Sequence, residues 1–213
     1  MLSEAVVDLL GMLAYGELLA FDRMAADARL APDLHRRAAL SSMAGVEIAN
    51  YNRLAARLAA LGADPEQAMV PFVEPLREYH DQTEPKDWLE ALAKAYVGDG
   101  VADDFFREVA GFLGSPDREL VLDVLHDTRY DEFACAEIRQ AIAEDPTVAN
   151  RLSMWSRRLV GEGLSQAQRV AAERPALAML IIEGTGDQAG VMALLKRLTT
   201  AHTTRMAELG LNN

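Results

Sequence analysis

Acidic side chains interrupt the apolar faces of four segments whose residue spacing is typical of helices. Between residues 40 and 61, apolar residues recur at steps of three and four, which keeps them on one helical face, and Glu47 lies at the middle of that face. Glu17, Asp99 and Asp127 occupy equivalent central positions in three other segments. Burying an ionised carboxylate without a partner costs several kcal/mol, so acids on core faces require a cation, a hydrogen-bond donor or a metal. We therefore expect these four acids to form a shared polar site.

The sequence separations of the acids are consistent with one common site. Glu17 and Glu47 are 30 residues apart, and Asp99 and Asp127 are 28 residues apart. In two antiparallel helical hairpins, these similar separations would bring all four carboxylates to one level of the bundle.

Two kinds of chemistry fit such a cluster. An oxygen-only site suits a hard cation such as Mg²⁺, Mn²⁺ or Ca²⁺, and Asp103 and Asp131, on the same faces, are further candidate ligands. The alternative is a cluster without metal. Its carboxylates, whose mutual repulsion raises their pKa values, would then share protons or accept hydrogen bonds from nearby tyrosines and from Asn50.

The elements that must position these acids are predicted to be helices throughout. Alanine and leucine dominate, and Pro and Gly fall at intervals of about 25 to 30 residues, which is typical of helices joined by short loops. We expect an all-α fold in one domain over 1–213, with four long helices in two antiparallel hairpins over 1–145 and accessory helices over 146–213. The four long helices are predicted at about 3–30, 33–61, 85–113 and 115–143.

The segment between the two predicted hairpins contains Pro65, Pro71, Pro75 and Pro85. Because proline removes a backbone donor and clashes with the preceding turn, this segment is predicted to be a long crossover connection and not one continuous helix. His80 falls within it, where a solvated side chain is expected.

Charge and composition exclude several classes of protein. The net charge of −12 argues against a protein that mainly binds a nucleic-acid backbone, although residues 146–213 hold 8 basic and 5 acidic residues. No apolar run reaches the roughly 18 residues of a membrane span, and acidic Glu4 and Asp8 lie where a signal peptide would be basic. We expect a cytoplasmic protein without membrane contact. The lone Cys135 offers neither a disulfide nor a cysteine-based metal site.

The order of the acids resembles a known pattern. One Glu from each of two helices and a Glu-x-x-His from each of two others form the carboxylate di-iron pattern of ferritin-like proteins. Here Glu17 matches the first acid, Glu47-Ile48-Ala49-Asn50 the first motif, Asp99 the third acid, and Asp127-Thr128-Arg129-Tyr130 the second motif. Both histidine positions therefore differ, as Asn50 and Tyr130.

Longer phrases carry the same resemblance over nearly the whole chain. They are YGELLAFDRMAADA, DWLEALAKAYVGDGVADDFFREVA and RLSMWSRRLVGEGLSQAQRV. Together they resemble actinobacterial-type ferritin-like proteins grouped near the tRNA hydroxylase that acts on 2-methylthio-N6-isopentenyl-adenosine. This resemblance implies two carboxylate-bridged irons that activate dioxygen to hydroxylate an unactivated carbon-hydrogen bond.

The departures from the pattern lead to a different expectation. Asn50 is a weak neutral ligand, Tyr130 is a ligand only as a phenolate, and Asp99 and Asp127 are one methylene shorter than Glu. We therefore expect a degenerate di-iron-type site that binds iron or manganese weakly or not at all, in a binding or structural module. Whether the protein is an enzyme stays open at this point.

The alternative is an O₂-dependent di-iron hydroxylase that acts on modified tRNA through the same four acids. Arg157 and Arg158, in the basic last third of the chain, would then be candidate phosphate contacts. A homodimer is the expected assembly.

Overall fold

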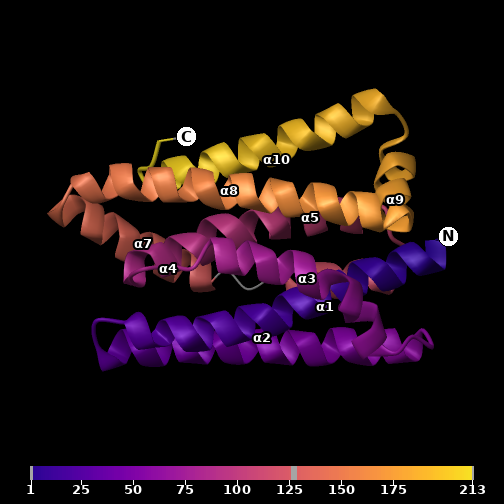
Figure 1. Ribbon diagram of the computed structural model, residues 1–213, viewed down its shortest axis with the longest axis horizontal. Coiled ribbons are helices and arrows are strands. Elements are labelled where there is room, and N and C mark those ends of the chain that lie inside the picture. The colour runs from indigo at the N-terminus through magenta and orange to yellow at the C-terminus, as the bar shows by residue number, and fades with distance from the viewer. Residues whose placement is uncertain (1, 126–128, 213) are drawn as a thin grey trace.

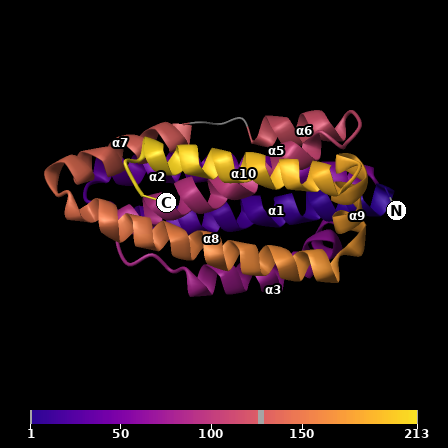
Figure 2. The ribbon, with the colours of Figure 1, turned by 90° about the horizontal axis from the view of Figure 1, so that it is seen from above.

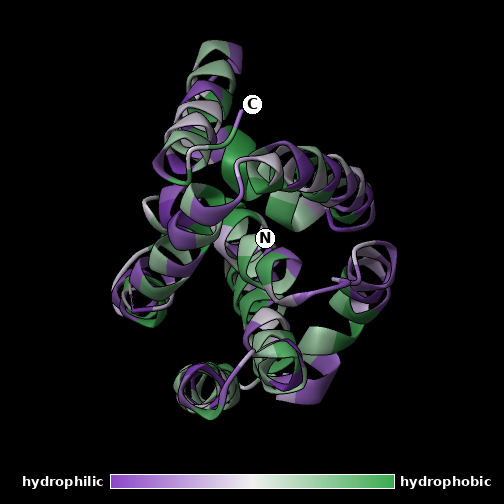
Figure 3. Ribbon diagram, turned by 90° about the vertical axis from the view of Figure 1, so that its left-hand side faces the viewer, coloured by the Kyte–Doolittle hydropathy of each residue, from purple (hydrophilic) through white to green (hydrophobic). Residues whose placement is uncertain are grey.

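The computed structural model describes residues 2–125 and 129–212, and every regular element in these ranges is a helix (Figure 1). The predicted all-α fold is confirmed. Figure 3 views the helices nearly end-on and shows that they carry both hydrophobic and hydrophilic residues, as amphipathic helices do. None of the described helices combines the length and the apolar character needed to cross a membrane.

The first hairpin consists of α1 (Leu2–Asp27) and α2 (Leu34–Ala60), joined through the short 3₁₀ helix η1 (Ala28–Leu30). The Asp33 side chain caps α2 by accepting a hydrogen bond from the Arg36 backbone N–H at 2.8 Å. The two long helices lie antiparallel and side by side (Figure 1). Their bounds agree with the predicted helices at 3–30 and 33–61.

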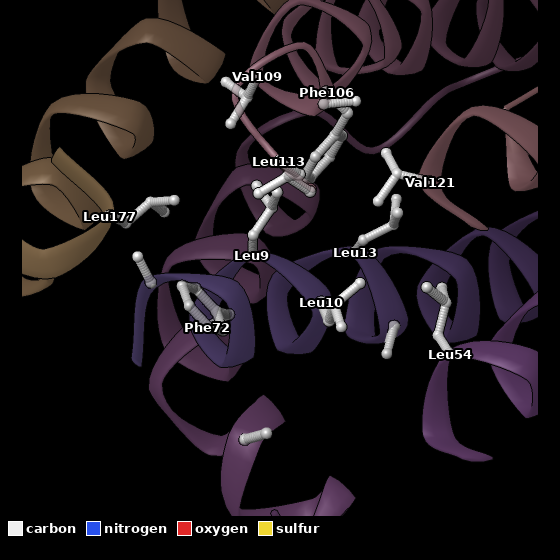
Figure 4. Close-up of a cluster of buried hydrophobic side chains, with 14 of the residues drawn as sticks. Leu9, Leu10, Leu13, Leu54, Phe72, Phe106, Val109, Leu113, Val121 and Leu177 are labelled. Carbon is white, nitrogen blue, oxygen red and sulfur yellow. The ribbon is translucent and has the colours of Figure 1, made fainter. Parts of the chain in front are cut away.

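The segment connects the first hairpin to the helices that follow, but the expectation that it is not one continuous helix is wrong: it forms α3 (Pro65–Gln82), with Pro71 and Pro75 inside it. The two prolines are four residues apart and therefore lie on the same side of the helix. Burial offsets the backbone donors that they remove: Phe72 is fully buried in an apolar cluster with residues of α1 (Figure 4). Tertiary packing has overridden the local tendency of proline to interrupt a helix.

The third predicted helix is present as a helical run with an irregular centre. It consists of α4 (Trp88–Ala93), the π-helical segment η2 (Lys94–Asp99) and α5 (Gly100–Ala110). Side chains from other helices approach the backbone here: a Cβ atom at Gly98 would meet the Tyr79 hydroxyl, and one at Gly100 would meet the Arg205 guanidinium.

The predicted unbroken helix at 115–143 is also wrong. The structure has α6 (Asp117–Val124) and α7 (Arg129–Glu144) as separate helices. Donors from elsewhere in the chain satisfy the carbonyls where α6 ends: the Asn50 amide donates to the Val124 carbonyl at 3.1 Å, and the Arg107 guanidinium donates to the Leu125 carbonyl.

Three helices complete the chain: α8 (Thr147–Glu173), α9 (Pro175–Thr185) and α10 (Gln188–Glu208). They cover one side of α1, and α1 is visible between α8 and α10 in Figure 2. Two ion pairs fix their positions. Arg174, directly after α8, pairs with the buried Asp8 of α1, and Arg205 of α10 pairs with Asp104 of α5 at 2.8 Å.

The core is divided into two clusters of buried apolar side chains. The first lies around the N-terminal half of α1 and includes Leu9, Leu10 and Phe72 (Figure 4). The second lies around the C-terminal half of α1 and includes Met24 and Leu92. Glu17 lies between the α1 residues of the two clusters.

Candidate functional site

The structure gathers most of the predicted acids around one cavity. The cavity has a volume of about 540 Å³, and its lining includes Glu17 of α1, Glu47 of α2, Asp99 of η2, Asp103 of α5 and Asp131 of α7. Asp127, the fourth acid of the predicted quartet, lies outside the described residues. The acids of α1, α2, η2 and α5 thus lie on faces that turn toward a common space.

Glu17 is the most deeply buried of these acids, with only 6% of its surface exposed. Its Oε2 atom has no hydrogen-bond partner in the part of the chain that the structure describes. Burial raises the pKa of Glu17 to about 10, and a hydrogen bond with Glu47 and the charges of Glu47 and Asp103 act in the same direction, whereas a hydrogen bond from Asn50 opposes them. Glu17 therefore keeps its proton at neutral pH.

Asp99 and Asp103 are partly accessible and line the cavity. Burial raises the pKa of Asp99 to about 8, with a further contribution from the charge of Asp103 and opposition from Lys94. Burial likewise raises the pKa of Asp103 to about 7, and the neighbouring Arg107 opposes this shift. Protons thus relieve the mutual repulsion of the acids.

The residues at the two expected histidine positions are engaged with the backbone. Asn50 is buried and donates to the Val124 carbonyl, and the Tyr130 hydroxyl donates to the Leu92 carbonyl at 3.2 Å. Burial, with a contribution from Asp99, raises the pKa of Tyr130 well above its ordinary value. The phenol is therefore protonated at neutral pH, which disfavours the phenolate that metal binding would need.

These donors do not fit a standard di-iron centre. The two expected histidine positions hold an amide and a phenol, and the imidazole in the described cavity wall, that of His80, comes from α3 and not from either position. Within residues 2–125 and 129–212, no group of three or more His, Cys, Asp or Glu side chains is arranged to hold a metal ion. Such a centre needs both bridging carboxylates and imidazole ligands in this fold.

Sequence reasoning missed several polar residues of the cavity wall, and Lys94 and His80 are the most deeply buried basic side chains among them. Lys94 is 4% exposed, donates from Nζ to the Thr83 carbonyl at 2.7 Å and lies 5.5 Å from the centroid of the Tyr79 ring. Burial lowers the pKa of Lys94 to about 8, and Asp99 opposes this shift. Lys94 opens the π-helical segment, in which the residues per turn differ from 3.6, so a regular helical wheel misplaces it.

His80 is 8% exposed, so the expectation of a solvated side chain is wrong. Burial, with the charges of Lys94 and Arg23, lowers the pKa of His80 to about 3, and the ring is neutral at physiological pH. Its Nδ1 atom has no hydrogen-bond partner among the described residues. Only the continuity of α3 brings His80 inward, and the prolines of α3 concealed that continuity.

The cavity is long, and its two halves differ in polarity. Residues 12–27 of α1 line one side, which corresponds to roughly 22 Å at 1.5 Å per residue. The half along residues 17–27 holds the charged side chains, whereas apolar side chains from the end of α8 and from α9 and α10 line the other half; they include Val170, Leu177, Ile181, Leu194 and Leu198. A volume of this size is typical of small-molecule sites in proteins.

Comparison with known proteins identifies the fold family. A family model described as "Ferritin-like domain, actinomycetes" matches residues 1–184. None of the curated proteins matches the chain.

Proposed function

Because the chain belongs to the actinomycete ferritin-like domain family, we propose that it is a binding module that holds a small apolar molecule in its cavity and lacks a standard di-iron centre. One observation carries this proposal: Asn50 and Tyr130 replace the two histidines and are bound to backbone carbonyls, beside a mostly apolar cavity of about 540 Å³. The carboxylates are then the polar end of a ligand site.

Metal binding is a secondary property under this proposal. Glu17, Glu47, Asp99 and Asp127, with Asp103 and Asp131, are the candidate ligands for a hard cation. A cation must displace the protons that Glu17, Asp99 and Asp103 hold, since metal ligands bind in their deprotonated form. Because Asn50 and Tyr130 stand at the two histidine positions, we expect iron or manganese to bind weakly or not at all.

Two measurements on the full chain test the proposal. After purification with excess iron(II), we expect elemental analysis to find less than one iron per chain and the absorbance of a di-iron centre to be missing. The neutral apolar dye N-phenyl-1-naphthylamine should gain fluorescence and saturate at one dye per chain. Two irons per chain, or no saturable dye binding, would contradict the proposal.

The competing function is an O₂-dependent hydroxylase that acts on modified tRNA. The apolar space next to the acids favours it, because a hydrocarbon substituent on a base would need such a space. Arg157 and Arg158 of α8 are exposed, although they also donate to the backbone carbonyls of Asn212 and Gln82. Salt-sensitive tRNA binding that weakens in an Arg157→Ala, Arg158→Ala variant would support this function. We expect no binding at low salt.

A further inference from the structure

We propose that the cavity takes a long-chain aliphatic amine, with the ammonium group at the acidic end and the hydrocarbon chain in the apolar half. This inference rests on the proposed function and adds the chemical class of the ligand. Three features of the cavity wall support it: unpaired acceptors, an excess of acids, and the separation of polar and apolar halves.

Buried acceptor atoms of the wall lack partners. Glu17 Oε2, His80 Nδ1 and Gln166 Oε1 have no hydrogen-bond partner within the described ranges, and their residues are 6%, 8% and 9% exposed. All three residues line the cavity. A buried acceptor without a donor costs about 1–3 kcal/mol, so such atoms are normally satisfied by protein, water or ligand. A ligand that brings several N–H donors, as an ammonium group does, satisfies them.

Two of these acceptors lie at the same level on opposite helices. The Asp8–Arg174 ion pair fixes the register of α1 against α8, and the two helices run antiparallel (Figures 1 and 2). Glu17 lies nine residues beyond Asp8, and Gln166 lies eight residues before Arg174. These separations correspond to about 13 and 12 Å along the helix axes, so Glu17 and Gln166 lie at about the same level of the cavity.

The charges of the wall favour a cation over an anion. Among the described residues, six acids and two bases line the cavity. The bases are Arg23 and Lys94, and the acids are Glu17, Asp27, Glu47, Asp99, Asp103 and Asp131. Some of these acids hold protons at neutral pH, so an ammonium group at this end would favour their ionised form, whereas the carboxylate of a fatty acid would disfavour it.

The apolar half provides the space for a hydrocarbon chain. Its walls come from α8, α9 and α10, and two of its lining residues, Leu164 of α8 and Leu195 of α10, are 56% and 47% exposed. These leucines place an apolar rim where the cavity reaches the surface between α8 and α10. A ligand that enters there with its head group first brings the ammonium group toward Glu17.

Displacement of N-phenyl-1-naphthylamine by three twelve-carbon ligands tests the inference. Dodecylamine, dodecanol and dodecanoate share the same tail, and each is used below the concentration at which it forms micelles. We expect dodecylamine to displace the dye at concentrations about tenfold lower than the other two, because only its head group is both cationic and rich in donors.

Three variants separate the roles of head group and tail. Glu17→Gln should remove most of the preference for the amine over dodecanol, and Glu183→Gln, an exposed change on α9, should keep the full preference and the dye binding of the natural sequence. Leu195→Gln, at the exposed rim, should weaken all three ligands alike. Circular dichroism and the melting temperature confirm that each variant is folded.

The outcomes distinguish this inference from the proposed function. If the dye binds but the three ligands compete equally, or dodecanoate competes best, the amine assignment is wrong and the apolar binding module stands. An unchanged amine preference in Glu17→Gln also overturns the assignment. If the dye does not bind, or two irons bind per chain, the proposed function fails and the ligand class fails with it.

Discussion

At the scale of single residues, Glu17 couples folding to proton binding. Its pKa is raised to about 10 in the folded chain, mainly by burial, so folding retains a proton that the unfolded chain releases above its ordinary pKa of 4.5. Between pH 6.5 and 8 the free energy of unfolding should therefore decrease as the pH rises. Asp99, whose pKa is raised to about 8, contributes in the same direction.

The variant Glu17→Gln should flatten this pH dependence, because glutamine has no proton to lose. For one fully shifted group the change in slope is at most about 1.4 kcal/mol per pH unit. Urea denaturation at several pH values measures it. Glu183→Gln should retain the slope of the natural sequence, and equal slopes in Glu17→Gln and the natural sequence would show that Glu17 is ionised in the folded chain.

Asn50 stands where the ferritin-like pattern has a ligand histidine, but its role in this chain is structural. Its amide satisfies the Val124 carbonyl where α6 ends, and both groups are buried. Asn50→Ala should lower the free energy of unfolding by about 1–3 kcal/mol, because it leaves a buried carbonyl without a donor. Asn52→Ala, two residues away on the exposed side of α2, should change stability by less than about 0.5 kcal/mol. Equal effects in the two variants would contradict this role.

At the scale of elements, α3 approaches α1 closely at Gly11. A Cβ atom there would collide with the Ala68 backbone carbonyl, which cannot move without shifting α3. Gly11→Ala should therefore destabilise the protein by about 1–3 kcal/mol in urea denaturation. Gly16→Ala is the matched control in the same helix, since nothing lies within 4 Å of its Cβ position. It should be neutral or stabilising, as expected for alanine in a helix.

The helices that the sequence predicts well are those with local signals. Asp33 caps α2, and the apolar periodicity of α1 and α2 sets the faces on which Glu17 and Glu47 lie. The failures have distant causes. The break after α6 depends on donors from Asn50 and Arg107, which lie in other helices and are invisible to a local pattern.

The polar wall of the cavity illustrates the same limit. His80 is buried only because α3 continues through its prolines, and Lys94 lies in a π-helical segment that a regular helical wheel does not describe. Periodicity therefore placed the acids in the interior, but it did not find the basic and neutral groups that face them.

At the scale of the whole molecule, Asp8 and Arg174 join the first helix to the junction between α8 and α9. The Asp8 side chain is 5% exposed and Arg174 is its ion-pair partner. Asp8→Asn should cost about 3 kcal/mol in the free energy of unfolding, because it removes the charge that pairs with a half-buried guanidinium. Asp22→Asn, on the exposed side of the same helix, should have little effect. A loss that is equally small in Asp8→Asn would mean that packing alone holds α8 against α1.

The expected homodimer stays a prediction. Light scattering on the purified chain measures its molar mass against the 23.3 kDa of one copy. A mass of one copy at micromolar concentration would argue against the dimer.

The helix α10 contributes four lining residues to the cavity, Val191, Leu194, Leu195 and Leu198, and all four are apolar. The acids that line the described cavity come from other helices. Substitutions of these four residues would therefore alter the tail lengths that fit and leave the recognition of the head group unchanged. In this architecture, selectivity for the two ends of a ligand can diverge independently during evolution.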